Sequence, residues 1–240
     1  LGAAVSAFLI VALLAGGIWF FRAGSPGGTP VGESVSQPLA AAERAEIKLS
    51  PAAGHLQVDA LTDSTALLAG EVRPAAGEQV EQTYELKDGV AHYTLGTSGR
   101  VWAPFRNGWE QWGWTLGLSD KPAIALQVSM GAGQMDLRLT DLNLSKLKVS
   151  LGVGQTTAWL PGTGRYTAEF SGAIGETVVI LPKGLGARIR SSTAIGSLTV
   201  PSGFASRDGV YYSPDYETAD NRVDLELSQA IGQVTVRVAP

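Results

Sequence analysis

The residues that could carry acid–base, nucleophilic or metal chemistry are few and scattered. Among 240 residues there are two histidines, His55 and His92, and neither has a second ligand at a spacing that metal sites use. A serine hydrolase needs a histidine base and favours a Gly-x-Ser-x-Gly turn, which the sequence lacks. Cysteine is absent, so thiol catalysis and thiolate metal sites are excluded. We therefore expect no enzymatic activity and no cofactor.

Three acidic residues, Asp136, Glu176 and Asp224, lie at positions that alternate with apolar residues. Alternation places them on an outward face, where solvated carboxylates are common. Sequence spacing leaves open whether two of them meet, as the paired carboxylates of a glycoside hydrolase do.

Glycine-rich stretches such as Gly152-Val153-Gly154-Gln155 could be read as phosphate-binding loops. A dinucleotide loop needs a third glycine and a following helix, and a phosphate loop needs Gly-Lys-Ser/Thr; neither pattern is present. The net charge of −4 gives no basic surface, so nucleic acid is not an expected partner.

An aromatic stretch supplies the candidate contact residues. Trp102, Phe105, Arg106 and Trp109 fit no strand alternation and lie in a segment with proline and glycine. Exposed aromatic side chains with an arginine suit a glycan, a lipid surface or a protein partner; a loop folded over the end of the domain is the alternative. Trp159 falls on an outward position and is the second candidate. Residues 112–118, by contrast, alternate as a core strand.

The elements that must position these residues come from a repeat. Apolar-x-apolar stretches flank a corner glycine at Gly133, Gly154, Gly175 and Gly196, which are spaced by 21 residues. A fixed period near twenty residues indicates a stacked array, because one unit cannot bury its apolar face alone. We predict an all-β, single-stranded β-helix-like solenoid with rungs of about 21 residues, each turning at its glycine.

The first and last units of the array match each other. Gly54 and Gly232 have the same flanking pattern, so the solenoid is expected to cover residues 44–240. An insertion is predicted at about 204–218. The final rung, 221–238, is predicted to end the stack, where it would pair with a partner or be shielded by this insertion.

The chain begins with an apolar stretch. Residues 1–21 carry no charge, and at 1.5 Å per residue they reach about 30 Å, the thickness of a bilayer core. We predict a retained transmembrane helix at 1–22, with a cleaved signal peptide as the alternative. Residues 23–43, rich in glycine, serine and proline, are predicted to be a flexible linker.

The order of these blocks resembles the toastrack family, the C-terminal domain of LiaF-like cell-wall-active antibiotic response proteins and of related adhesin-like proteins. The resemblance covers about residues 45–240. Its blocks in order are Ala53-Gly54-x-Leu56-x-Val58, Ala66-Leu67-Leu68-Ala69-Gly70, Trp112-Gly113-Trp114, Met130-Gly131-Ala132-Gly133, Asp141-Leu142, Leu181-Pro182, Asp208-Gly209-x-Tyr211 and Ile231-Gly232-Gln233-Val234. It implies a right-handed β-helix-like body tied to a membrane, without enzymatic activity.

The resulting prediction is a non-enzymatic, membrane-anchored protein of the bacterial cell envelope. Residues 1–21 would contact lipid, and the solenoid would lie outside the cytoplasm. By resemblance, the protein would sense or regulate envelope stress through contacts with an envelope protein partner. The alternative is a structural or adhesive component that assembles as a homo-oligomer or binds a surface polymer.

Overall fold

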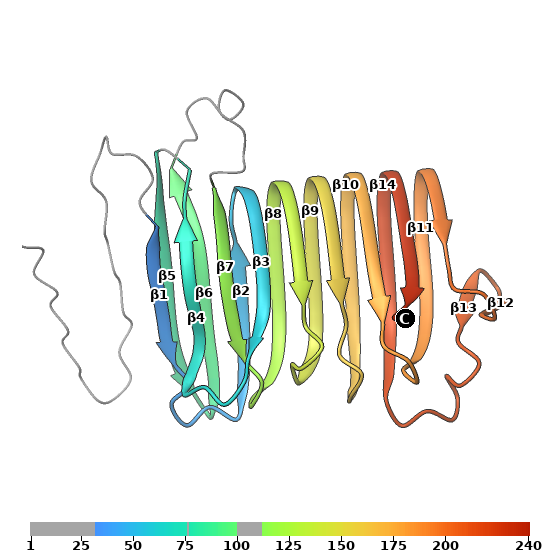
Figure 1. Ribbon diagram of the computed structural model, residues 1–240, viewed down its shortest axis with the longest axis horizontal. Helices are drawn as coiled ribbons and strands as arrows, with labels where there is room; N and C mark the ends of the chain where they lie inside the picture. Colours follow the sequence, from blue (N-terminus) through green and yellow to red (C-terminus); the bar gives the residue numbers. More distant parts are fainter. Residues whose placement is uncertain (1–31, 76, 100–111) are drawn as a thin grey trace, which may run out of the picture.

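The computed structural model describes residues 32–75, 77–99 and 112–240. This part of the chain is built from strands joined by turns (Figure 1). The strands are β1 (Glu33–Pro38), β2 (Arg44–Ser50), β3 (Ala53–Leu61), β4 (Ala66–Arg73), β5 (Glu78–Lys87), β6 (Val90–Gly99), β7 (Gly113–Ser119), β8 (Ala123–Arg138), β9 (Leu144–Trp159), β10 (Arg165–Leu181), β11 (Gly186–Thr199), β12 (Ala205–Arg207), β13 (Val210–Tyr212) and β14 (Arg222–Val238). The prediction of an all-β solenoid is confirmed.

Each long strand forms one rung by bending at its corner glycine, so that its two halves lie in two layers (Figure 1). The rungs β8, β9, β10, β14 and β11 pair in parallel and in register. β2 and β3 together form the first rung of this series. The corner glycines consequently lie side by side in one column, as the 21-residue spacing predicts.

The core lies between the two layers and is made by alternate residues of every rung. In β8, Leu126 and Val128 point inward before the corner, and Met135 and Leu137 point inward after it; none is more than 1% exposed. Burying a side chain of this kind contributes about 1.5–3 kcal/mol. Stacking the rungs repeats this contribution along the whole body.

The corner glycines are required by space as well as by conformation. Gly154 has φ +140° and Gly175 has φ +142°, values that side chains other than glycine rarely adopt. A Cβ atom on either residue would overlap the carbonyl oxygen of the corner glycine on the preceding rung. The same overlap would occur at Gly133, Gly232 and Gly196.

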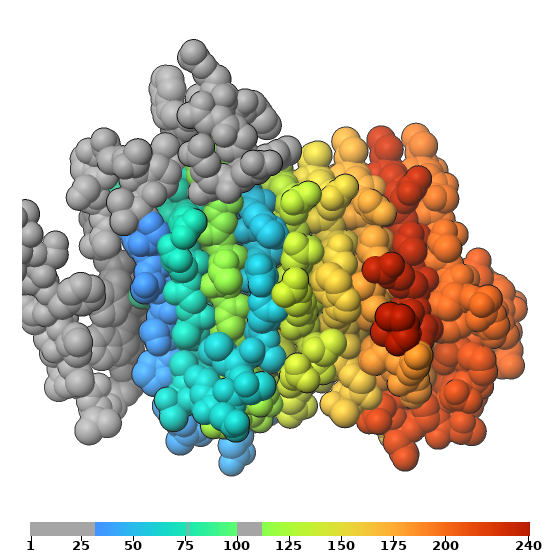
Figure 2. Space-filling view, viewed as in Figure 1, coloured from blue at the N-terminus to red at the C-terminus, as the bar shows by residue number. Residues whose placement is uncertain are grey.

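The rung order corrects one prediction. The last strand of the chain, β14, does not end the stack but lies between β10 and β11, paired in parallel with both (Figures 1 and 2). The segment between β11 and β14 returns the chain from the outermost rung, β11, to the position between β10 and β11. Asn221 then holds the start of β14 in place: its Oδ1 accepts from Gly164 N at 2.9 Å and its carbonyl accepts from Gly186 N at 3.0 Å.

The inserted segment contains a hairpin that covers part of β11. β12 and β13 pair antiparallel, with a turn at Asp208 and Gly209, both of positive φ. β13 pairs with Arg188–Arg190 of β11. The insertion therefore covers part of β11, and not the final rung 221–238, for which the sequence left open pairing with a partner or shielding by this insertion.

At the N-terminal end of the stack, β6 and β7 add one more parallel strand to each layer, and antiparallel strands lie outside them. β5 and β6 form a hairpin, and β6 pairs in parallel with β2. β7 pairs with β3, β4 pairs with β7, and β1 pairs with β4. Trp112 and Trp114 are buried, as the alternation of residues 112–118 predicts.

β1 contradicts part of the linker prediction. Residues 33–38 fall within the predicted flexible linker 23–43, yet they form an edge strand with β4. The glycine, serine and proline content of this segment does not indicate a strand. In the structure Val35 is 6% exposed and lies opposite Gly70 of β4. The predicted transmembrane helix at 1–22 lies outside the described residues. Within them, no helix is long and apolar enough to cross a membrane.

Replacing Gly154 with Ala should destabilise the fold far more than the same change at Gly184. Gly184 also has a positive φ, +81°, but a Cβ there meets no atom within 4 Å. We expect Gly184→Ala to lose about 1–2 kcal/mol from backbone strain alone. We expect Gly154→Ala to lose more than about 4 kcal/mol, or to prevent folding, because the rungs must separate. Denaturant unfolding followed by circular dichroism measures both, and equal losses would contradict a steric role for the column.

Candidate functional site: the corner groove

A row of serines runs along the solenoid beside the glycine column. The residue four positions before each corner glycine is serine, and parallel in-register pairing brings these residues together. In stacking order the row is Ser50, Ser129, Ser150, Ser171, Ser228 and Ser192. We call it the serine ladder. Neighbouring strands are about 4.8 Å apart, so one hydroxyl is presented at each step of that length.

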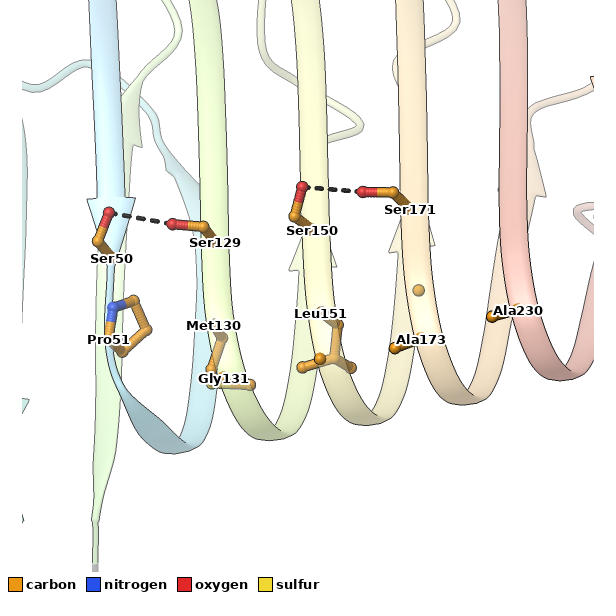
Figure 3. A pocket seen from close by; sticks show the side chains of 12 residues that line it. Ser50, Pro51, Ser129, Met130, Gly131, Ser150, Leu151, Ser171, Ala173 and Ala230 are labelled. Carbon is orange, nitrogen blue, oxygen red and sulfur yellow. Dashed lines mark hydrogen bonds between the residues drawn. The ribbon is translucent and has the colours of Figure 1, made fainter.

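The serine hydroxyls are partly occupied by one another (Figure 3). Ser50 Oγ lies 3.1 Å from Ser129 Oγ, and Ser150 Oγ lies 2.9 Å from Ser171 Oγ. Ser171 Oγ can also donate to the carbonyl of Val149 at 3.3 Å. A hydroxyl has one donor and two acceptor sites, so these pairs leave capacity for a ligand.

A shallow groove of about 570 Å³ lies between the ladder and the corner. Small residues line it two positions before four of the corner glycines, and Met130 and Leu151 contribute nearly buried side chains (Figure 3). The small residues are Gly131, Gly152, Ala173 and Ala230. Because they lack large side chains, the surface is hollowed along several rungs. We call this surface the corner groove.

An exposed apolar ridge borders the groove at the position just before each corner glycine. In stacking order the ridge is Val153, Ile174, Ile231 and Ile195, which are 46%, 50%, 44% and 66% exposed. Single exposed apolar residues are ordinary, but a continuous row marks an interaction surface. We call it the corner ridge.

The groove and ridge carry almost no charge. From the ladder serine to the residue after the corner glycine, rungs β8, β9, β10, β14 and β11 contain one charged residue, Glu176. The strand faces differ, because they carry ion pairs between rungs, such as Lys148 with Glu169 at 3.1 Å. The corner surface is therefore suited to an uncharged ligand.

Gln229 supports the ridge from inside. Its side chain is 3% exposed, its Nε2 donates to the Ile231 carbonyl at 3.1 Å, and its Oε1 accepts from Thr177 at 3.3 Å. The space that it occupies exists because the neighbouring rung has Gly172, where a Cβ would overlap the Gln229 amide. This pair holds the corner of β14 in position.

Of the contact residues predicted from the sequence, Trp159 is the one within the described residues, and it does not line the groove. Trp102, Phe105, Arg106 and Trp109 lie outside the described residues. Trp159 is half-buried at the end of β9, and the Arg138 guanidinium lies 5.8 Å from its ring centroid. Its role as a contact residue stays a prediction.

The acidic residues and histidines are distributed over different rungs. Asp136 pairs with His55 at 2.8 Å, and Asp224 pairs with Arg188 at 2.9 Å. Asp224 precedes its corner whereas Asp136 and Glu176 follow theirs, so Asp224 lies in the opposite layer. Within the described residues no group of three potential ligands could hold a metal ion.

The strongest pKa shifts in the described residues have structural causes. Burial raises the pKa of Tyr93 and of Tyr166 above the ordinary tyrosine range. The Tyr166 hydroxyl donates to the Pro161 carbonyl at 2.7 Å, and the Tyr93 hydroxyl donates to Gln82 at 2.9 Å. Neither tyrosine lines the corner groove.

The serine ladder was not among the residues selected from the sequence, although its signal is present there. Every corner glycine has serine four residues earlier. A single serine outside a recognised motif gives no indication of function. Its meaning depends on repetition at a constant distance from the corner.

Comparison with known proteins agrees with this architecture. A sequence model of the N-terminal domain of toast_rack, DUF2154, matches residues 26–180, more than half of the chain. The chain belongs to the toastrack family. No curated protein matches the chain. The family match confirms the resemblance seen in the sequence.

Solved structures show where the toastrack fold recurs. A "putative cell adhesion protein" from Clostridium sporogenes ATCC 15579 is 20% identical, with a TM-score of 0.76 over 88% of this chain and 100% of that one. At this identity the likeness shows the fold alone. A "putative adhesin" from Bacteroides fragilis NCTC 9343 is 10% identical over 88% of this chain and 100% of that one, with a TM-score of 0.29.

Removing a ladder hydroxyl should leave the toastrack fold almost as stable as before. Ser150→Ala removes one half-exposed hydrogen bond and should lose less than about 1 kcal/mol. Phe170→Ala, one residue before Ser171 and facing the core, should lose about 3–5 kcal/mol. Urea midpoints measure both changes. A large loss for Ser150→Ala would assign the ladder to the fold instead of to a ligand.

Proposed function

We propose that this toastrack protein is a non-enzymatic cell-envelope component that binds an uncharged surface polymer along its corner groove. Residues 1–21 would anchor it in the membrane, with the solenoid outside the cytoplasm. The observation that carries the proposal is the in-register serine ladder beside an uncharged groove that spans several rungs.

The repetition of the site favours a repeating ligand. Rungs β9, β10 and β14 offer the same set of groups, namely a serine hydroxyl, a small residue in the groove and an apolar residue on the ridge. A ligand made of identical units could place one type of contact on successive rungs. Many weak contacts then add up through effective concentration, without any single strong subsite.

The chemistry of the groove favours a neutral polysaccharide. Sugar rings carry hydroxyls at their edges and C–H groups on their faces, which match the ladder and the ridge respectively. An anionic polymer would have to desolvate its charges against Val153 and Ile174 without a cation in the groove. The "putative cell adhesion protein" of similar fold supports an adhesive role of this kind.

The predicted role in sensing or regulating envelope stress rests on the family resemblance. It requires a membrane protein partner. Copurification with such a partner, and altered transcription after cell-wall antibiotics when the gene is deleted, would support it. Polymer binding is the function that the corner groove itself supports.

Placing a charge in the groove should abolish binding to a neutral polysaccharide. Ala173 is exposed and lines the groove, so Ala173→Glu introduces a carboxylate there. Because alanine already has a Cβ atom, the substitution extends an existing side chain. Affinity electrophoresis in gels that contain soluble α- or β-linked glucan measures binding as retarded migration. We expect the unaltered protein to be retarded and Ala173→Glu to lose at least about 90% of the retardation, an effect of about 1.4 kcal/mol.

Ala205→Glu is the matched control, because Ala205 is also exposed but lies in β12, away from the groove. It should migrate as the unaltered protein does. Polygalacturonate serves as the acidic comparator polymer. Failure of every neutral glucan to retard the protein, or equal effects of the two substitutions, would contradict the proposal.

A further inference from the structure

The outermost rung, β11, has an edge that is only partly covered. β14 lies on its inner side, and β13 pairs with Arg188–Arg190 on its outer side. Among the described residues, Ser191–Thr199 has no partner strand on that outer side. The N–H and C=O groups of this stretch that point outward are therefore available for pairing with another chain.

This edge lacks the features that usually protect an exposed strand. Residues 191–199 read Ser-Ser-Thr-Ala-Ile-Gly-Ser-Leu-Thr, with no charge and no proline. The opposite end of the solenoid differs. Its outer strand β5 carries Glu78, Glu81, Glu85 and Lys87. Charged side chains and proline are the ordinary protection of sheet edges, so the β11 edge is the unprotected one.

The corner of β11 is also the most exposed part of the corner ridge. Ile195 is 66% exposed, compared with 44% for Ile231 on the neighbouring rung. Val153, Ile174 and Ile231 each have a rung on both sides, whereas Ile195 has one on a single side. A strand added at this edge would cover Ile195 and continue the ridge.

We propose that a second copy of this chain adds its own β11 to this edge, antiparallel, to form a two-fold symmetric dimer. The bend of the rung selects this arrangement. The two-fold axis would lie perpendicular to the stacking direction and pass between the two β11 rungs at their corners. Rotation about it places each half of one β11 over the opposite half of the other β11. The two strands then run in opposite directions. Corner then meets corner, with Ile195 opposite Ile195 of the second copy, and the pairing uses the same surface on both copies.

The length of the free edge agrees with this pairing. With Ile195 at the centre, Ser191 lies opposite Thr199 of the second copy. The free stretch 191–199 can therefore pair over its whole length with the same stretch of the second copy. Beyond Thr199, Pro201 turns the chain away, and the β12–β13 hairpin already covers Arg188–Arg190. Each hairpin therefore marks where the second copy must end.

The dimer would also complete the open end of the core. Leu198, Val200 and Phe204 are only partly buried at this end, where they pack against the core from one side. A second β11 would cover them and join two solenoids end to end. This proposal does not rest on polymer binding, although it would extend the corner ridge into a second copy.

Cysteine cross-linking tests the proposed register directly, because the chain has no cysteine of its own. Ile195→Cys places a thiol next to its counterpart across the axis, where opposed Cβ atoms are about 4.5–5.5 Å apart. Val153→Cys is the matched control, since it occupies the same corner position inside the stack. With the full chain in detergent micelles and a short bis-maleimide reagent, we expect at least about tenfold more covalent dimer for Ile195→Cys.

Charge substitutions test the same interface without a cross-link. Ile195→Lys places like charges at the axis and should weaken dimerisation by at least about tenfold, whereas Val153→Lys should leave it unchanged. Size-exclusion chromatography with light scattering on the full chain measures the oligomeric state. A monomeric unaltered chain, equal cross-linking at both cysteines, or a dimer that Ile195→Lys does not weaken would each overturn the proposal. A dimer with glucan binding absent would support this interface and reject the proposed function.

Discussion

The rungs of this solenoid are held in register by close backbone contact within the glycine column. At Gly154 and Gly175 the corner backbone of one rung lies so near the next that no Cβ can be accommodated. The column therefore fixes the register of all the parallel rungs. Once that register is fixed, every position counted from the corner forms a row of equivalent residues. The serine ladder, the groove and the ridge are rows of this kind, so the site follows from the packing of the scaffold.

The position of β14 decides which surfaces are left free. A chain that ended with its last rung outermost would expose its terminal strand. Here that strand is held between β10 and β11, with Asn221 bonded to Gly164 and Gly186 at its entry. The exposed edge then belongs to β11, whose hairpin protects one part and leaves the other uncovered. The same arrangement adds Ile231 and Ile195 to the ridge, since it brings both corners into line with Ile174.

The binding groups on this surface are rows of equivalent side chains from successive rungs, which no short sequence motif describes. The described residues carry ion pairs between rungs on the strand faces, such as Lys148 with Glu169, and nearly no charge at the corner. Hydroxyls and aliphatic groups, repeated at the spacing of the strands, form a long uncharged surface. Each rung alone makes few contacts that would distinguish one ligand from another. Binding of an extended, uncharged partner is the activity to which such a surface is suited.

The repeat, the corner glycines, the alternating core and the toastrack resemblance can all be predicted from the sequence, because each depends on spacing along the chain. The sequence also contained the serine ladder, although a single serine gives no sign of function until the rungs are stacked. The place of β14 inside the stack could not be predicted in this way. The strands on either side of it, β10 and β11, offer similar parallel edges, and the local sequence pattern does not distinguish between them. Likewise, β1 formed within a segment of linker composition because β4 offered it an edge, with Gly70 opposite Val35.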